Sequence, residues 1–140
     1  MKLYAESSAV LAWLLGEPTM GAVWSHLSSA ETVFSSELTL IECDRVLIRA
    51  VVTGQISETD GADRRAALAD ASAHWTLLRV DADVVMRARR PFPVEPIRTL
   101  DALHLASALV ARAAQPGVAV LSLDERVRKC GASLGFAVFP

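Results

Sequence analysis

Four carboxylates stand at places in this sequence where an apolar chain is expected to keep none. Glu6 follows the first short apolar run, and Glu42 lies inside an amphipathic segment. Asp101 opens a nearly all-apolar segment, and Asp124 comes just after a Val/Leu run. Carboxylates can share one place only if a cation or shared protons relieve their repulsion. If the fold brings these four together, they predict an acidic pocket for a divalent metal ion.

The elements that would position these acids follow from alternating strand and helix patterns. Short strands are expected over residues 2–5, 32–35, 75–80, 118–121 and 136–139. One helix is expected to begin at an N-cap, Ser7 or Ser8, and to end at residue 15, and another is expected over residues 37–52 with Ser36 as its N-cap. Further helices are expected over residues 20–27, 57–73, 81–89, 99–113 and 125–130. This alternation favours βαβ units. We therefore predict an α/β fold in which a central parallel sheet of about five strands is flanked by helices, with the acids converging at one sheet edge.

Length and composition limit the possible domain organisation and location of the protein. The chain has 140 residues, a hydrophobic fraction of 52% and a mean hydropathy of +0.34. The length suits a single domain over residues 1–140, and the apolar content suits a covered sheet or an oligomer. No run reaches the roughly 18 apolar residues of a membrane span, and no signal-peptide pattern is seen. We therefore expect a cytoplasmic protein with no membrane partner.

Cysteine, histidine and overall charge argue against several other classes. Cys43 and Cys130 lie far apart, and the three histidines form no metal-binding motif, so neither a disulfide framework nor a zinc site is indicated. A net charge of -2 argues against broad, charge-driven binding of nucleic acid. The G-x-G-x-x-G motif of a dinucleotide-binding domain is missing. Any contact with nucleic acid must therefore be local.

Each carboxylate also has an ordinary structural explanation. Glu42 shares a helical face with apolar residues and could pair with Arg45 or Arg49. Asp101 could be favoured by the macrodipole of a helix that Thr99 caps.

The same holds for the other two acids. Asp124 could be the N-cap of the helix that begins at Glu125, and Glu6 could accept backbone N–H bonds at the start of the first helix. No single acid decides between a structural role and a metal-binding one.

Four stretches surround these acids in a specific order. They are L-Y-A-E-S-S-A at 3–9, L-T-L-I-E at 38–42, T-L-D-A-L-H-L-A-S-A-L at 99–109, and L-S-L-D-E-R at 121–126 with Gly135 and Phe136 after it. This order resembles the PIN domain family, and most closely the VapC type of toxin from bacterial toxin-antitoxin pairs. The similarity spans essentially the whole chain, and the stretch at 99–109 is its most specific part.

The resemblance implies an enzyme, a metal-dependent ribonuclease that holds Mg²⁺ or Mn²⁺ and hydrolyses RNA phosphodiesters as the toxin of such a pair. By position, Glu6, Glu42, Asp101 and Asp124 match the acidic residues of the family. We assign Asp101 and Glu6 as the principal metal contacts and Glu42 and Asp124 as additional or water-mediated ligands, and one of the four acids would orient the attacking water. Whether one metal ion or two bind is left open. The resemblance also implies an RNA substrate, a homodimer and a cognate antitoxin that blocks the acidic pocket.

The residue at position 6 departs from the family pattern. The family usually has Asp where this chain has Glu6, so the acid here is one methylene longer. Mg²⁺ requires nearly octahedral oxygen geometry at about 2.0 to 2.1 Å, and a longer arm could displace the ion. The alternative function is therefore a catalytically weak or inactive PIN-like module that binds RNA or protein.

Basic residues near Asp101 form a candidate substrate contact. Arg87, Arg89 and Arg90 precede a Pro-rich loop, and Arg98 follows it. This local positive patch could hold RNA phosphates, although cations at a solvated helix end explain it equally well.

Three further side chains have two possible roles each. His104 lies one turn after Asp101 and could hydrogen-bond it, but a buried histidine with satisfied hydrogen bonds is the more ordinary role. Trp13 and Trp24 are better explained as core or oligomer-interface anchors than as platforms for RNA bases.

Overall fold

Five parallel strands form one sheet in the computed structural model, which describes residues 1–140. Their order is β3-β2-β1-β4-β5, and Tyr4 of the central strand lies opposite Phe34 on one side and Val120 on the other. The strands are β1 (Lys2–Ala5), β2 (Thr32–Ser36), β3 (Thr76–Leu78), β4 (Val118–Leu121) and β5 (Val138–Phe139). The predicted α/β fold with a central parallel sheet of about five strands flanked by helices is confirmed.

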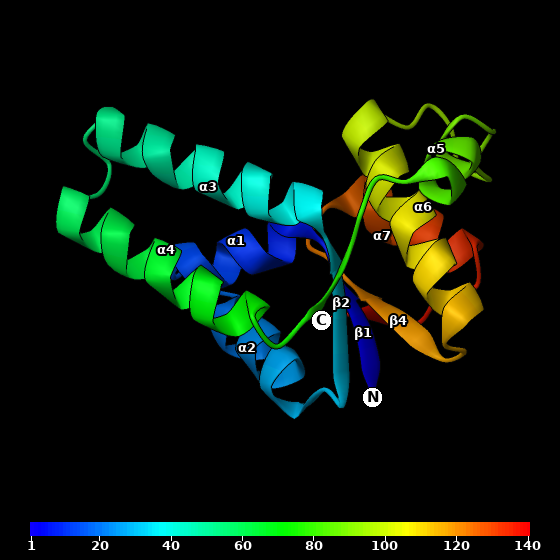
Figure 1. Ribbon diagram of the computed structural model, residues 1–140, viewed down its shortest axis with the longest axis horizontal. Helices are drawn as coiled ribbons and strands as arrows, with labels where there is room; N and C mark the ends of the chain where they lie inside the picture. The colour runs from blue at the N-terminus through cyan, green and yellow to red at the C-terminus, as the bar shows by residue number, and fades with distance from the viewer.

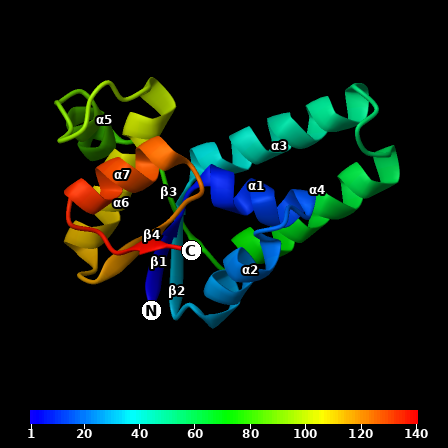
Figure 2. The same cartoon turned by 180° about the vertical axis from the view of Figure 1, so that it is seen from behind.

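Seven helices cover the two faces of this sheet. They are α1 (Ser7–Leu15), α2 (Met20–Ser29), α3 (Glu37–Val52), α4 (Glu58–Ser72), α5 (Ala82–Ala88), α6 (Thr99–Ala114) and α7 (Glu125–Ser133). Helices α1 to α4 lie on one side of the sheet and α5 to α7 on the other, while α3 and α4 form a long antiparallel pair that extends beyond the strands (Figure 1). The same separation is seen from behind (Figure 2). No helix has the length and apolar character needed to cross a membrane.

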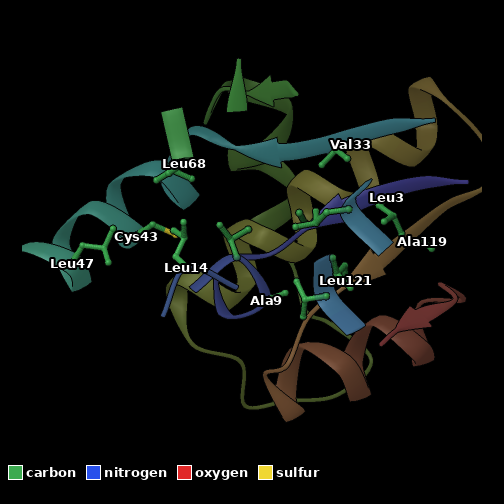
Figure 3. Packing of buried hydrophobic residues seen from close by; sticks show 13 residues of the cluster. Leu3, Ala9, Leu14, Val33, Cys43, Leu47, Leu68, Ala119 and Leu121 are labelled. Carbon is green, nitrogen blue, oxygen red and sulfur yellow. The ribbon is translucent and has the colours of Figure 1, made fainter. Parts of the chain in front are cut away.

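The three central strands, β1, β2 and β4, are largely buried, and their apolar side chains alternate between two cores. Leu3 and Leu121 pack with α1 to α4, together with Cys43 of α3 (Figure 3). Tyr4 and Val120, their neighbours in sequence, pack with the helices of the opposite face. Successive strand residues point to opposite sides, so a strand covered on both sides must be apolar throughout. This accounts for the high hydrophobic content of the chain.

Most element boundaries agree with the sequence prediction, and the differences have local causes. Ser36 caps α3 as expected, since its hydroxyl accepts the N–H of Leu38 at 3.1 Å. Strands β3 and β5 are shorter than predicted. Helix α7 is longer and ends where Gly135 adopts a positive φ of 83°, a conformation that favours glycine.

The topology places the candidate acids at one edge of the sheet. Glu6 directly follows β1, and the helix that carries Glu42 begins where β2 ends. Asp124 follows β4 by a short turn, and Asp101 lies in the first turn of α6, which packs against β2. The carboxyl ends of parallel strands share one edge, which is the usual location of sites in open α/β sheets.

Candidate active site at the carboxyl edge of the sheet

Glu6 is a buried carboxylate surrounded by serine hydroxyls. Its side chain is only 4% exposed. Ser7 Oγ donates to Oε1 at 2.8 Å, Ser122 Oγ donates to Oε2 at 2.7 Å, and Ser8 also donates to Oε2. A buried charge must be hydrogen-bonded to be tolerated, and these three donors meet that need. The longer arm at position 6 is therefore accommodated by specific contacts.

Ser8 joins the end of β1 to the segment after β4. While its hydroxyl donates to Glu6, the same oxygen accepts the N–H groups of Leu123 at 2.9 Å and Asp124 at 3.1 Å. These contacts use the one donor and two acceptor sites of a hydroxyl. The prediction that Ser7 or Ser8 caps the first helix was wrong, because Glu6 occupies the N-cap position without a side-chain cap and both hydroxyls turn toward its carboxylate.

Glu42 is bound by His104 from the opposite side of the sheet. His104 Nε2 lies 2.6 Å from Oε1 of Glu42, and His104 Nδ1 lies 2.9 Å from the hydroxyl of Tyr4. The histidine is 1% exposed, whereas the Glu42 side chain remains 26% exposed. His104 is therefore a buried histidine with partners on both nitrogens, and its carboxylate partner is Glu42 rather than Asp101. Glu42 does not pair with the arginines of its own helix.

Asp101 is paired with a cation from the residue that precedes α6. Arg98 Nε lies 3.0 Å from Asp101 Oδ2, and Nη2 of the same guanidinium lies 3.5 Å from Asp124 Oδ2. Asp101 itself is 7% exposed. Arg98, not Thr99, occupies the N-cap position of α6, and its side chain makes no capping bond. Arg98 thus bridges two of the four candidate acids.

Asp124 has a structural role in addition to this ion pair. Its Oδ1 accepts the N–H groups of Arg126 at 2.9 Å and Val127 at 3.1 Å, which caps α7. The capping explanation is therefore correct for one carboxylate oxygen. The other oxygen faces Arg98.

A chain of hydrogen bonds and ion pairs connects the four acids. Glu42 reaches Glu6 through His104 and Ser7, with His104 Nε2 3.3 Å from Ser7 Oγ. Glu6 reaches the backbone N–H of Asp124 through Ser8, and the Asp124 carboxylate reaches Asp101 through Arg98. Neither Tyr4 nor Ser122 was predicted to lie at this edge. The position of Ser122 at this edge could have been predicted, because Ser122 directly follows β4.

The four carboxylates are suitable ligands for a hard cation, but their positions do not form a complete coordination shell. All four candidate donors are carboxylates, the ligands that Mg²⁺ and Mn²⁺ prefer. Oε2 of Glu42 and Oδ1 of Asp101 accept no hydrogen bond from the protein, so both retain free lone pairs. No three acidic, histidine or cysteine side chains, however, lie close enough together to hold an ion. Glu42 is instead linked to Glu6 through His104 and Ser7, and Asp101 is linked to Asp124 through the guanidinium of Arg98.

Burial and ion pairing shift the pKa of three groups at or near this edge. Burial raises the pKa of the Tyr4 phenol, which therefore stays protonated and can donate its hydrogen. The hydrogen bond and negative charge of Asp101 raise the pKa of Arg98. Burial also raises the pKa of the Cys43 thiol, next to Glu42 in the chain, to about 12. Cys43 is thus a protonated core thiol and not a nucleophile.

The four arginines of the predicted basic patch have different surroundings: two of them contact nearby side chains, and the other two line a surface cavity. The Arg87 guanidinium stacks over the Phe92 ring at 4.2 Å from its centroid, and Arg98 turns to the acids. Arg89 and Arg90 line a cavity of about 240 Å³. Ala102, the neighbour of Asp101, lines the same cavity, so these two arginines lie beside the start of α6.

The two tryptophans pack on each other and not at the acidic edge. Trp13 and Trp24 stack with ring centroids 5.2 Å apart, and Trp24 is 47% exposed. Trp13 packs against the core of the α1 to α4 face. A role as packing anchors agrees with this position.

Comparison with known families assigns the chain to one of them. The family model of the PIN domain matches residues 3–132, which is most of the chain. The protein belongs to the PIN domain family.

Individual relatives place it among VapC proteins. The chain is 34% identical over 136 residues to Ribonuclease VapC46 of Mycobacterium tuberculosis, covering 97% of this chain and 95% of that one. Among solved structures, it is similar to VapC20 of M. tuberculosis, described as a Sarcin-Ricin loop cleaving toxin, with 18% identity, a TM-score of 0.66 and 99% of both chains covered. It is also similar to a structure of FitAB bound to a DNA fragment, with 17% identity, a TM-score of 0.70, and 99% and 94% covered.

Proposed function

We propose that this protein is a metal-dependent ribonuclease that hydrolyses RNA phosphodiesters and acts as the toxin of a toxin-antitoxin pair. The observation that carries the proposal is the connected edge on which Glu6, Glu42, Asp101 and Asp124 lie. Membership of the PIN family and identity with Ribonuclease VapC46 over nearly the whole chain support it.

The proposed roles of the acids follow from their surroundings. A bound Mg²⁺ or Mn²⁺ would lower the pKa of the attacking water and stabilise charge on the phosphoryl oxygens. Asp101 and Glu6 are assigned as the principal ligands of that ion. Glu42 and Asp124 are assigned as additional or water-mediated ligands, and the free Oε2 of Glu42 suits a contact with the attacking water.

The residues around the acids keep these groups in place. Ser7, Ser8 and Ser122 fix the orientation of the Glu6 carboxylate, and Arg98 balances the charge of Asp101 and Asp124. A cation at Asp101 would compete with Arg98. The guanidinium is 63% exposed and can turn outward, where it could contact an RNA phosphate.

A second candidate function is a PIN-like module that binds RNA or protein with weak or no cleavage. One observation favours it: both oxygens of Glu6 already accept hydrogen bonds from serines, and no three acids form a ready coordination shell. Under this alternative, the longer Glu6 side chain accepts structural hydrogen bonds and does not bind a metal ion.

The proposal includes partners and location. We infer a cognate antitoxin that covers the acidic edge, a homodimer and a cytoplasmic setting, because the chain resembles VapC proteins along nearly its whole length.

The test of the enzyme proposal is an RNA cleavage assay with Mg²⁺ or Mn²⁺ on single-stranded and structured RNAs. We expect cleavage that EDTA abolishes and added metal restores. Asp101→Asn should abolish cleavage with the fold intact, because it removes an anionic ligand, whereas Asp63→Asn on the exposed surface of α4 should not. If the native chain binds RNA but cleaves none under any metal, the binding-module alternative replaces the enzyme proposal.

A further inference from the structure

His104 is a buried polar side chain to which the proposed chemistry gives no role. It lies on α6, one turn after Asp101, with 1% of its surface exposed. Its ring contacts three different elements: Tyr4 on β1, Glu42 on α3 and Ser7 at the start of α1. A histidine that only fills the core does not need a carboxylate partner at the edge of the candidate active site.

The partners define which ring nitrogen carries a hydrogen. The carboxylate oxygen of Glu42 is an acceptor, so we assign the hydrogen of the 2.6 Å contact to Nε2 of His104. With that hydrogen on Nε2, Nδ1 is the acceptor nitrogen of the ring, and the Tyr4 hydroxyl 2.9 Å away can donate to it. The ring is thereby held at both ends.

The Nε2 hydrogen also lies next to the Glu6 side of the site. Ser7 Oγ is 3.3 Å from Nε2 and donates its own hydrogen to Oε1 of Glu6 at 2.8 Å. The His104 ring therefore connects Glu42 on α3 with Glu6, which follows β1, through the hydroxyl of Ser7. It uses Oε1 of Glu42 and leaves Oε2 free.

Glu42 needs such a contact because nothing else in the protein restrains its carboxylate. It is 26% exposed on α3, and its only hydrogen-bond partner is His104. A free glutamate side chain samples several rotamers, and only some would direct Oε2 toward Asp101 and Glu6.

We propose that His104 is a positioning residue for RNA hydrolysis: its Nε2 hydrogen holds Oε1 of Glu42 so that Oε2 faces the metal or the attacking water, while Tyr4 fixes the ring. The inference rests on the proposed ribonuclease function and adds a residue to it. His104 makes no contact with the reacting atoms, and its effect passes through Glu42.

Two substitutions separate positioning from simple core packing. In His104→Gln the amide nitrogen reaches about as far as Nε2 and can still donate to Glu42, whereas the shorter amide of His104→Asn reaches only about as far as Nδ1. Both are uncharged amides that place a polar group in the same core. A purely structural role therefore predicts similar losses in both.

The experiment measures kcat and KM for RNA together with the Mn²⁺ concentration that gives half-maximal thermal stabilisation. We expect His104→Asn to lower kcat, or to raise that Mn²⁺ concentration, by about ten- to hundredfold with KM for RNA little changed, as is typical when a partner of a metal ligand is removed. His104→Gln should recover most of this loss. Equal behaviour of the two variants, whether both active or both impaired, overturns the proposal.

A third variant keeps the test decisive if the asparagine variant does not fold. Tyr4→Phe retains the aromatic core but frees the imidazole to turn, so kcat should fall by a smaller factor with KM unchanged. Native kcat in this variant would contradict the positioning role.

Failure of the positioning role and failure of the ribonuclease function give different results in these experiments. A native chain that cleaves RNA but shows no difference among these variants removes only the role of His104. A native chain with neither cleavage nor Mn²⁺ stabilisation removes the ribonuclease function, and the positioning role with it.

Discussion

Arg98 and Asp101 form an ion pair one helical turn apart, with Nε and Oδ2 separated by 3.0 Å, and the same guanidinium reaches Asp124 at 3.5 Å. The arginine is 63% exposed, so the pair itself contributes little to stability. Its importance lies in its position. A monovalent side-chain cation lies between two acids that the family resemblance assigns to a divalent ion.

Removal of this cation should strengthen metal binding. In Arg98→Ala, Asp101 and Asp124 lose their counter-charge, so Mn²⁺ should raise the melting temperature at a lower concentration than in the native protein. Without metal, the variant should be nearly as stable as the native protein, because an exposed ion pair contributes little to stability. Thermal scans over a Mn²⁺ titration measure both effects. Arg90→Ala, whose side chain contacts no acid, is the matched control; equal metal dependence in both variants would show that Arg98 does not compete.

Shortening Glu6 should separate its structural role from its metal-binding role. Glu6→Asp withdraws the carboxylate by one methylene and weakens its bonds to the three serines, so the unfolding free energy should fall by about 1 kcal/mol. RNA cleavage should be kept or increased, because Asp is the usual family residue. Denaturant unfolding and the cleavage assay measure the two effects. An active native chain with an inactive Glu6→Asp variant would mean that this site requires the longer arm.

The Ser8 hydroxyl should stabilise the fold more than an ordinary serine. Ser8→Ala removes a donor to buried Glu6 and leaves the N–H groups of Leu123 and Asp124 without their acceptor, so we expect a loss of about 1–3 kcal/mol. Urea unfolding measures it. In the exposed control Ser28→Ala the change should stay within about 0.5 kcal/mol, since that hydroxyl bonds only carbonyl groups of its own helix. A loss at Ser8 no larger than the control's would contradict the role of this hydroxyl as a link.

Cys43 should make stability depend on pH in the alkaline range. Its folded pKa is about 12 against an ordinary value of 9.0, so the unfolded chain loses this proton first. Stability is therefore unaffected below about pH 9 and falls as the pH rises from 9 to 12, with a slope of up to about 1.4 kcal/mol per pH unit from this group. Urea unfolding at several pH values measures the slope. Cys43→Ala should lose less stability over the same interval, and parallel curves would show that the thiol does not contribute.

Local pattern in the sequence is sufficient for most of the fold. The bounds of α3 and β4 follow from a capping Ser36, a helical period and a four-residue apolar run. Strands that are apolar throughout and alternate with helices require a parallel sheet covered on both faces. Acids placed just after strands then converge at one edge, which is why the location of Glu6 and Asp124 could be predicted. The exact ends of β3 and β5 could not, because edge strands depend on pairing with a single neighbour.

The fold class and the sheet edge at which the four acids lie could thus be predicted, since both follow from periodicity and chain order. The partners of those acids could not, because they depend on tertiary packing. Glu42 pairs with His104 across 62 positions, and Ser122 reaches Glu6 across 116. Such contacts depend on which side chains face one another after helices from both sides of the sheet have packed. Neither periodicity nor propensity carries that information, because both describe each segment relative to its own axis.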